Sequence, residues 1–363
     1  MRIRRTFPIV LAVVIIVGAV VLAVQLRKHA PPEPARLLPG ADGFLYIDYS
    51  WIRRFAGKTF NPVTHDPEYE QFIQETGFDY ERDLDSVAFA IHYPETWPGG
   101  GTGGRAPEAR FSEVFTGRFD SNRCSAYFKR MAKSVENYDS VDIFTIPIYG
   151  RTFRIAILGV DTVAASNHED PAVIHGMVDR SRRLASPFGG PALLRRYYKH
   201  VQLASPVWLV AHVQPSSPAF GEWTSFLPNP ADVVISASFN PLHLPFRAGA
   251  LHLRAEAWAG NEQDARVIAD KANVFLALFH SAETFVGSPG TDADVKALFE
   301  SLQVKQEGSR AVLLATVPTE VLRKLTEAPD QIPAPVPEVE QPQPAKSKNQ
   351  GSAAKAHKPA RRH

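Results

Sequence analysis

The pattern of apolar and polar positions divides the chain into a long apolar N-terminal segment, a middle part of short alternating runs, and a polar end. In the middle part, short runs rich in Val, Ile and aromatic residues are bounded by Gly, Pro, Asn and Asp, a pattern typical of strands. The predicted strands are 44–48, 86–93, 114–119, 141–148, 153–160, 162–166, 207–213, 232–239, 251–258 and 310–317.

Apolar residues spaced three and four apart predict helices between these strands. Tyr127, Met131 and Val135 fall on one face of a predicted helix over 121–135. Asp170-Pro171 is typical of a helix start, with an N-cap before a proline in the first turn. Further helices are predicted over 69–75, after Asn261, after a capping-box pattern at 291–294, and over 319–325.

The order of these elements predicts an α+β fold. Adjacent strands joined by short turns form antiparallel sheets, and we expect the helices to pack on one face of them. A strand–helix–strand–strand–helix order recurs loosely, once over 113–183 and once over 249–326.

The N-terminal segment from Thr6 to Leu26 contains no charged residue, and basic residues stand on both sides of it. A helix of this length is about 31 Å long, close to the hydrocarbon thickness of a bilayer. We therefore expect a transmembrane helix over 6–26 behind a short cytoplasmic tail, 1–5. The alternative is a cleaved signal peptide, for which Val21-Leu22-Ala23 offers small residues. The length of the apolar run favours the uncleaved span.

The rest of the chain is expected to lie outside the cytoplasm, because a short N-terminal tail is the easier part to retain inside. This describes a single-pass protein of the cytoplasmic (inner) membrane whose domain faces the periplasm or exterior. Residues 27–37 read as a Pro-rich stalk, 38–204 and 205–327 as the two halves of an ectodomain, and 328–363 as a disordered Pro-rich basic tail. The tail either touches an anionic envelope surface or only solvates the domain; composition favours the second.

The distribution of charge along the chain argues against nucleic-acid binding. The formal net charge is +2, but the two ends are basic: five basic and no acidic residues in 1–30, six basic and three acidic in 328–363. Residues 31–327 are therefore at −6, and such a surface argues against a nucleic-acid partner. The single cysteine, Cys124, excludes an intramolecular disulfide.

Three segments carry a resemblance to a family. They are Leu38-Pro-Gly-Ala-Asp-Gly-Phe-Leu-Tyr-Ile-Asp48, Thr76-Gly-Phe-Asp-Tyr-Glu-Arg-Asp83 and Phe115-Thr-Gly-Arg-Phe-Asp120. Over the first half of the ectodomain the chain resembles a group of uncharacterised bacterial membrane-anchored proteins. The resemblance implies an anchored ectodomain and brings no catalytic residue with it.

Several motifs resemble nucleotide-binding, metal-binding or reactive-cysteine sites, but a structural role explains each of them better. Gly99–Gly104 satisfies G-x-G-x-x-G, but a strand follows where a nucleotide site needs a helix. His175 and Asp179, one turn apart, could ligate a metal, yet they lack the further ligands of a known motif. Cys124 falls inside an amphipathic helix and is expected to be packed. We predict no catalytic residue, no cofactor and no metal site.

One basic and aromatic cluster stands out at Arg195, Arg196, Tyr197 and Tyr198. These residue types are enriched at interaction hot spots, so the cluster is a candidate partner surface; a helix end exposed to solvent is the simpler interpretation. The sequence thus predicts a membrane-anchored binding or structural module of the bacterial cell envelope, with an envelope protein or anionic surface as partner. The alternative is an envelope hydrolase whose carboxylates are scattered along the chain.

Overall fold

The computed structural model describes residues 30–56, 66–93, 108–148, 150–182, 189–215, 224–239, 250–285, 293–318 and 320–321. The expected transmembrane segment 6–26, the Gly-rich stretch 99–104 and the tail 328–363 lie outside these ranges. Within them, no helix combines the length and the apolar character needed to cross a membrane.

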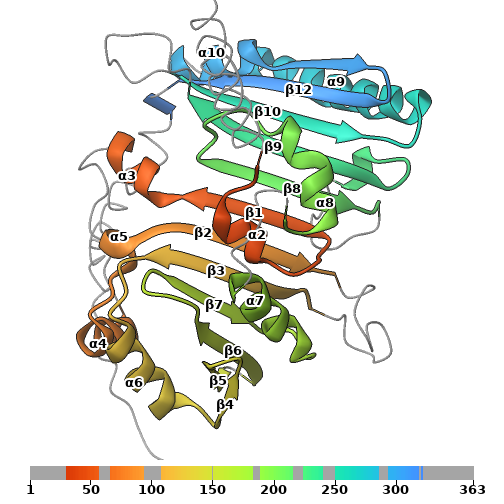
Figure 1. Cartoon of the computed structure of the whole chain (residues 1–363). Coiled ribbons are helices and arrows are strands. Elements are labelled where there is room, and N and C mark those ends of the chain that lie inside the picture. Colours follow the sequence, from red (N-terminus) through yellow and green to blue (C-terminus); the bar gives the residue numbers. More distant parts are fainter. Residues whose placement is uncertain are drawn as a thin grey trace, which may run out of the picture. The chain divides into compact units, whose positions relative to one another are not determined.

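Twelve antiparallel strands form one sheet within the described residues (Figure 1). Their order across the sheet is β11-β12-β10-β9-β8-β1-β2-β3-β7-β6-β5-β4. The strands are β1 Gly43–Asp48, β2 Leu84–His92, β3 Arg110–Gly117, β4 Ser134–Tyr138, β5 Val141–Ile148, β6 Arg151–Ile157, β7 Thr162–Ser166, β8 Val207–Val213, β9 Ala231–Phe239, β10 Leu251–Trp258, β11 Gln303–Glu307 and β12 Arg310–Val317.

The mixed α+β fold is confirmed, and all ten predicted strands are present with shifts of a few residues at their ends. The expectation of several sheets is wrong, because β1 pairs with β2 on one side and with β8 on the other. That pairing joins the two halves of the ectodomain into one continuous sheet.

The described helices are α2 Glu33–Leu37, α3 Tyr49–Ala56, α4 Pro67–Thr76, α5 Tyr80–Asp83, α6 Ser121–Met131, α7 Ala172–Arg182, α8 Ala192–Tyr197, α9 Glu262–Phe285 and α10 Ala293–Ser301. A 3-10 turn, Tyr198–His200, follows α8. Several begin as predicted from local chemistry. Asp170 accepts a hydrogen bond from the amide of Ala172, and Asn261 accepts one from Asp264, so each satisfies an otherwise free amide at a helix start.

The main core lies on one face of the sheet, beneath α2, α7 and α8. Phe44 and Tyr46 of β1 point to this face, together with Trp208 and Val210 of β8. The same cluster includes apolar residues of the three helices: Ala35, Leu37, Ile174, Met177, Val178, Leu194 and Tyr197. These helices shield the face from water, which accounts for its buried side chains.

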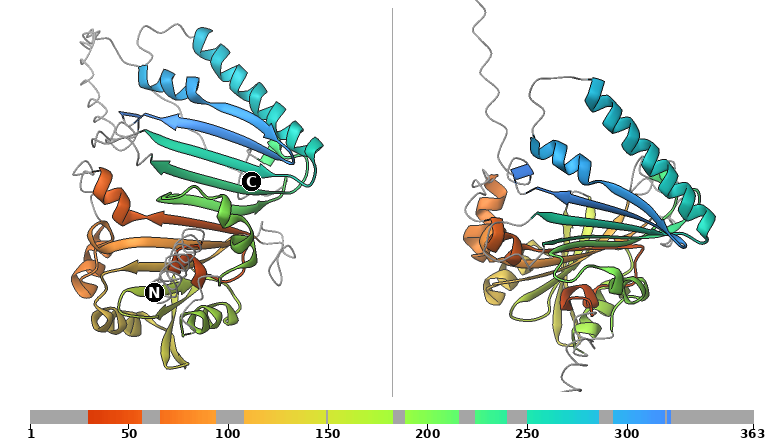
Figure 2. Two further views of the ribbon diagram at one scale, coloured as in Figure 1. Left: turned by 45° about the horizontal axis from the view of Figure 1, so that its top comes forward. Right: turned by 90° about the horizontal axis from the view of Figure 1, so that it is seen from above.

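Helix α9 packs on the opposite face, so the expectation that helices cover only one face is wrong (Figure 2). Ile268 and Ala269 of α9 form a second cluster with Ala311 of β12 and Ala257 of β10. Trp258, the next residue of β10, packs against the main core instead. Because successive strand residues point to opposite faces, the two clusters lie on opposite sides of the sheet.

Two further expectations are corrected. Residues 33–37 of the predicted stalk form α2, in which Ala35 and Leu37 are buried in the main core. The helix predicted over 121–135 ends at Met131, and Val135 lies in β4 opposite Phe144. Packing against the core prevails over the local pattern in α2, and hairpin pairing with β5 prevails over helical periodicity at Val135. The recurring order survives in part, as β3–α6–β4–β5 and as β10–α9–α10–β11–β12.

Candidate functional site

The predicted partner surface on α8 is divided between solvent and core. Arg195 and Arg196 are exposed, whereas Tyr197 is only 6% exposed. Tyr198 sets its ring edge-on to Trp208, with 5.2 Å between ring centroids. Burial, more than the hydrogen bond to Asp232, raises the pKa of Tyr197 to about 12. The partner surface stays a prediction, and its accessible part consists of the two arginines.

The residues considered as metal ligands have other partners. His175 stacks on Tyr138 with ring centroids 4.1 Å apart, and the Tyr138 hydroxyl donates a 3.1 Å hydrogen bond to Asp179. Across the part of the chain that the structure describes, no group of three His, Cys, Asp or Glu side chains could hold a metal ion. Cys124 is buried in α6, and burial raises the pKa of its thiol, which disfavours the reactive thiolate.

A serine–histidine pair lies inside the sheet and is not an accessible nucleophile. The Ser112 hydroxyl is 3.0 Å from Nε2 of His92 and 2.9 Å from the hydroxyl of Ser166. Burial, followed by the nearby His168, lowers the pKa of His92 to about 4, so the ring is neutral at ordinary pH. Ser112 is fully buried, and no substrate could reach it without unfolding. The arrangement satisfies polar groups inside the protein.

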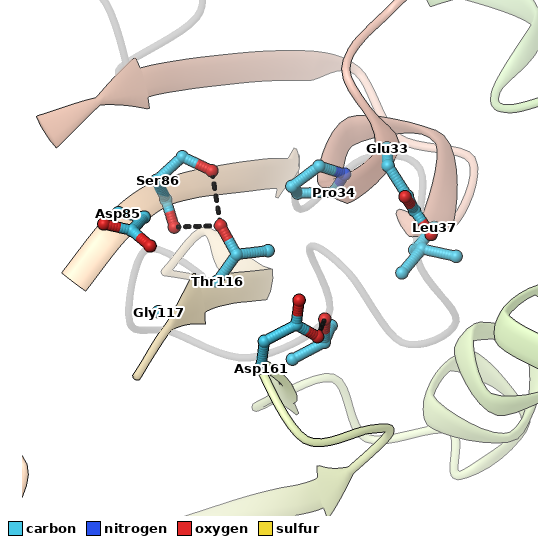
Figure 3. Close-up of a pocket in the computed structure, with 9 residues that line it drawn as sticks. Glu33, Pro34, Leu37, Asp85, Ser86, Thr116, Gly117 and Asp161 are labelled. Atoms are coloured by element: carbon cyan, nitrogen blue, oxygen red, sulfur yellow. Dashed lines mark hydrogen bonds between the residues drawn. The ribbon is translucent and has the colours of Figure 1, made fainter. Parts of the chain in front are cut away.

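An open hollow of about 260 Å³ lies beside α2 on the main-core side of the sheet (Figure 3). Its lining is Glu33, Pro34, Leu37, Asp85, Ser86, Thr116, Gly117, Asp161 and Thr162. The Ser86 and Thr116 hydroxyls are hydrogen-bonded at 2.7 Å, and Asp85 forms an ion pair with Arg53 at 2.9 Å. The hollow is therefore acidic and rich in hydroxyl groups.

The opposite face of the sheet is apolar from one edge to the other. The strand registers place twelve residues, one from each strand, in a single cross-strand row. From β4 to β11 the row reads Val135, Phe144, Ile155, Ala165, Glu113, Phe89, Leu45, Leu209, Ile235, Ala255, Leu313 and Val304. Eleven of the twelve are apolar, and Glu113 is the exception.

The flanking rows on this face share its character. One row contains Phe111, Ile91, Gly43, Ala211, Val233, Ala257 and Ala311. The other contains Val163, Phe115, Val87, Ile47, Val207, Ala237, Leu253 and Ala315. We call the part of these three rows on β3, β2, β1, β8 and β9 the apolar face.

The apolar face is only partly covered. Helix α9 packs over β10, β11 and β12, and α6 over β5 and β6, where Phe128 contacts Phe144. Between them, Leu45, Leu209 and Phe89 stay partly exposed, and Ile235 is 37% exposed. The second half of α9 adds exposed apolar side chains of its own: Val274, Phe275 and Leu278. Contiguous exposed apolar surface of this kind marks interaction sites in soluble domains.

Glu113 is the one ionisable residue in the three rows. Its neighbours along β3 on the same face are Phe111 and Phe115, and Phe89 lies opposite on β2. No hydrogen bond or ion pair links its carboxyl to any described residue, and burial raises its pKa to about 7. A desolvated carboxyl with a perturbed pKa is a candidate functional group.

The sequence contains a pattern that indicates this face, although the pattern by itself does not predict a binding site. Strands such as 44–48 and 207–213 are apolar at successive positions, which indicates that both of their faces meet apolar surroundings. The run Phe111-Ser-Glu-Val-Phe115 puts one glutamate between two aromatic residues of the same face. The register that aligns Glu113 with Phe89 could not be obtained from the pattern.

Comparison with known proteins identifies no family for this chain and finds only distant structural similarity. No protein-family model and no curated protein matches the chain. Solved structures of TP0453 are distantly similar. Crystal form III is 12% identical, with a TM-score of 0.43, over 82% of this chain and 98% of that chain. Crystal form IV is 10% identical, with a TM-score of 0.41, over 81% and 96%. Likeness at this level carries no argument about function.

Proposed function

We propose that the chain is a membrane-anchored, non-catalytic binding module of the bacterial cell envelope, and that its apolar face holds an apolar or amphiphilic ligand. One observation supports this more than any other: large apolar side chains remain partly exposed across five adjacent strands in the middle of the sheet. Covering one such side chain contributes about 1 kcal/mol, so a ligand that spans several strands gains useful affinity.

The geometry of a sheet face favours an alkyl chain over a peptide. Backbone N–H and C=O groups of the central strands are already bonded to neighbouring strands, and Glu113 is the one residue of the three rows whose side chain can form hydrogen bonds. A peptide lying there would leave backbone polar groups unsatisfied, at roughly 1–3 kcal/mol each. An alkyl chain has no such groups.

The anchor is the second part of the proposal. The uncharged segment 6–26 is long enough to span a bilayer and is followed by a domain of about −6 formal charge. A tethered domain stays close to a lipid phase, where amphiphiles are concentrated. The location in the inner membrane, facing the periplasm or exterior, rests on the same segment.

Titration of the full chain in lipid nanodiscs tests ligand binding, with empty nanodiscs as the reference. The neutral probe 1-decanol should bind saturably beyond its partition into lipid. Ile235→Asn places a polar group on the apolar face and should weaken decanol binding about fivefold, the equivalent of about 1 kcal/mol. Val160→Asn is the matched control, because Val160 is an apolar residue 81% exposed outside this face. Decanol uptake no greater than that of empty nanodiscs contradicts the proposal.

The acidic hollow supports a second candidate, an envelope hydrolase. Glu33, Asp85 and Asp161 line it together with hydroxyl groups, and paired carboxylates perform glycosidic hydrolysis. Hydrolysis of cell-wall glycan by the full chain, abolished by Asp161→Asn and unaffected by Glu68→Gln, would favour this candidate over the binding module.

A further inference from the structure

Glu113 is held in an aromatic setting by the strand register. Phe111 and Phe115 are its neighbours on the same face of β3, and Phe89 lies directly opposite on β2. The Phe89 and Phe115 rings meet edge to face, with centroids 6.5 Å apart. On the other side, β7 contributes Ala165, which is too small to cover the carboxyl. Three phenylalanines are therefore the nearest neighbours of Glu113 on β2 and β3 of this face.

The carboxyl has no partner among the described residues, and this is unusual for the chain. Glu256, on the other face, is only 2% exposed and is paired with both Arg254, at 2.6 Å, and Arg310, at 3.0 Å. Removing a carboxylate from water without such pairing is costly, and native proteins rarely leave it so. Glu113 bears that cost on the apolar face, where its side chain is partly buried.

The Glu113 carboxylate and the neighbouring phenylalanine rings favour a positively charged ligand. A carboxylate attracts a cation and repels an anionic head group. The faces of phenylalanine rings carry negative potential and also attract cations, most strongly where water is excluded. An organic ammonium group satisfies both, and its alkyl chain can continue over Leu45 and Leu209 of the same row.

We propose that Glu113, together with Phe89, Phe111 and Phe115, binds the ammonium group of a single cationic amphiphile whose alkyl chain lies on the apolar face. This inference rests on the proposed function, because it names the charge of the ligand that the apolar face would hold.

Binding should depend on pH through Glu113 itself. No charged or titratable side chain of β2, β3 or β7 shares the face next to Glu113. Helix α6, which packs over β5 and β6, carries Cys124, Arg123, Lys129 and Arg130, and none of them contributes to the pKa of Glu113. That pKa is raised to about 7 by burial. The carboxylate form, which the cation needs, is therefore depleted as the pH falls below 7.

The test uses the full chain in lipid nanodiscs and three probes with the same alkyl chain: decyltrimethylammonium, 1-decanol and decyl sulfate. At about pH 8 we expect decyltrimethylammonium to bind at least about tenfold more tightly than decanol, and decyl sulfate more weakly than either. Between about pH 8 and pH 5.5 the affinity for the ammonium probe should fall at least about sevenfold and approach that of decanol, as Glu113 becomes protonated. Decanol affinity should not change.

Glu113→Gln should reduce ammonium affinity to that of decanol and remove its pH dependence, while decanol binding persists. Glu68→Gln is the matched control, because Glu68 is exposed on α4. Saturable decanol binding without preference for the ammonium probe overturns this inference and leaves the proposed function standing. Absence of decanol binding overturns both.

The lysines of the basic tail, residues 328–363, are the alternative ligand for the Glu113 carboxylate. A full-length variant with Lys346, Lys348, Lys355 and Lys358 changed to Gln distinguishes it. Unchanged affinity for the ammonium probe supports the amphiphile. A rise of about tenfold would mean that tail lysines occupy the Glu113 site, and would overturn the inference.

Discussion

Glu113 and Phe89 lie directly opposite each other on β3 and β2, in the row of side chains that crosses all twelve strands. A charged residue thus faces an aromatic ring at the centre of an otherwise apolar row. The pairing has consequences for stability, because the carboxyl is removed from water and no other described residue pairs with it.

The first prediction concerns the pH dependence of stability. The pKa of Glu113 is raised from 4.5 to about 7, so between these values the folded state holds a proton that the unfolded state releases. Stability should therefore fall as the pH rises through this window. Glu113→Gln should increase the free energy of unfolding by on the order of 3 kcal/mol at about pH 8 and leave it unchanged near pH 4. Urea denaturation at the two pH values measures this.

The titration of His92 changes the free energy of unfolding with pH in the opposite direction. Both proteins in that comparison must therefore contain His92. Its pKa is lowered to about 4, so the unfolded state takes up its proton first as the pH falls below 6.5. Stability from this group is lost on acidification. The difference between wild type and Glu113→Gln isolates the glutamate. A gain that is equal at both pH values would mean that Glu113 is not desolvated.

The second prediction concerns Glu256. Its carboxylate pairs with Arg254 and Arg310 in a buried position, so Glu256→Ala removes the buried partner of two guanidinium groups. We expect a loss of about 3–5 kcal/mol in the free energy of unfolding. Glu307→Ala also removes a partner of Arg310, but at an exposed site, and should cost less than about 1 kcal/mol. Chemical denaturation of both variants gives the comparison; similar losses would contradict a buried network.

The third prediction tests the docking of α2 and the residues that follow it. Leu38 is 1% exposed and belongs to the main core, so Leu38→Ala should destabilise the protein by about 2–5 kcal/mol. Glu33→Ala, at an exposed position of α2, should change stability by less than about 0.5 kcal/mol. Thermal unfolding measures both. A Leu38→Ala variant as stable as wild type would mean that this segment is a stalk that does not pack in the core.

The fourth prediction is membrane topology. A reporter fused after Leu325 should be active only if it functions outside the cytoplasm, because segment 6–26 is expected to span the inner membrane with its N-terminus inside. The chain should also resist extraction by carbonate. Reporter activity in the cytoplasm would reverse the orientation, and release by carbonate would exclude the anchor.

The fifth prediction is that residues 328–363 are dispensable for folding. Seven prolines and a Lys-, Gln- and Ala-rich composition leave no apolar surface to pack. Truncation after Glu327 should shift the thermal midpoint by no more than about two degrees. Truncation before Val317 removes part of β12 and should prevent folding, since β12 joins β10 to β11. A ten-degree loss from the shorter truncation would show that the tail is docked.

Sequence alone was sufficient for the local elements. Apolar runs bounded by turn residues predicted β5, β7, β8, β10 and β12 with their observed bounds. Asp170 and Asn261 marked helix starts, because a side-chain oxygen next to free backbone amides is a local interaction. The mixed fold class followed from the order of these elements.

Tertiary packing overrode the local pattern elsewhere. The Pro-rich segment before Leu38 contains a helix turn because Ala35 and Leu37 have a core to enter. Val135 lies in a strand because β5 offers a partner edge. The core that α2 enters is formed largely by residues distant in the sequence, whereas β5 follows β4 directly in a hairpin.

The sequence determined many of the strands and helix starts, because propensities, caps and turn residues act within a few positions of one another. Only the tertiary structure decided what each side chain meets. Glu113 and Glu256 both stand in apolar strands, and of the two only Glu256 has a basic residue, Arg254, two positions away on its own strand. Strand order and register place Arg310 beside Glu256 and Phe89 beside Glu113. One carboxylate is therefore neutralised within the fold, and the other has no partner among the residues that the structure describes, because strand order and register bring together residues distant in the chain.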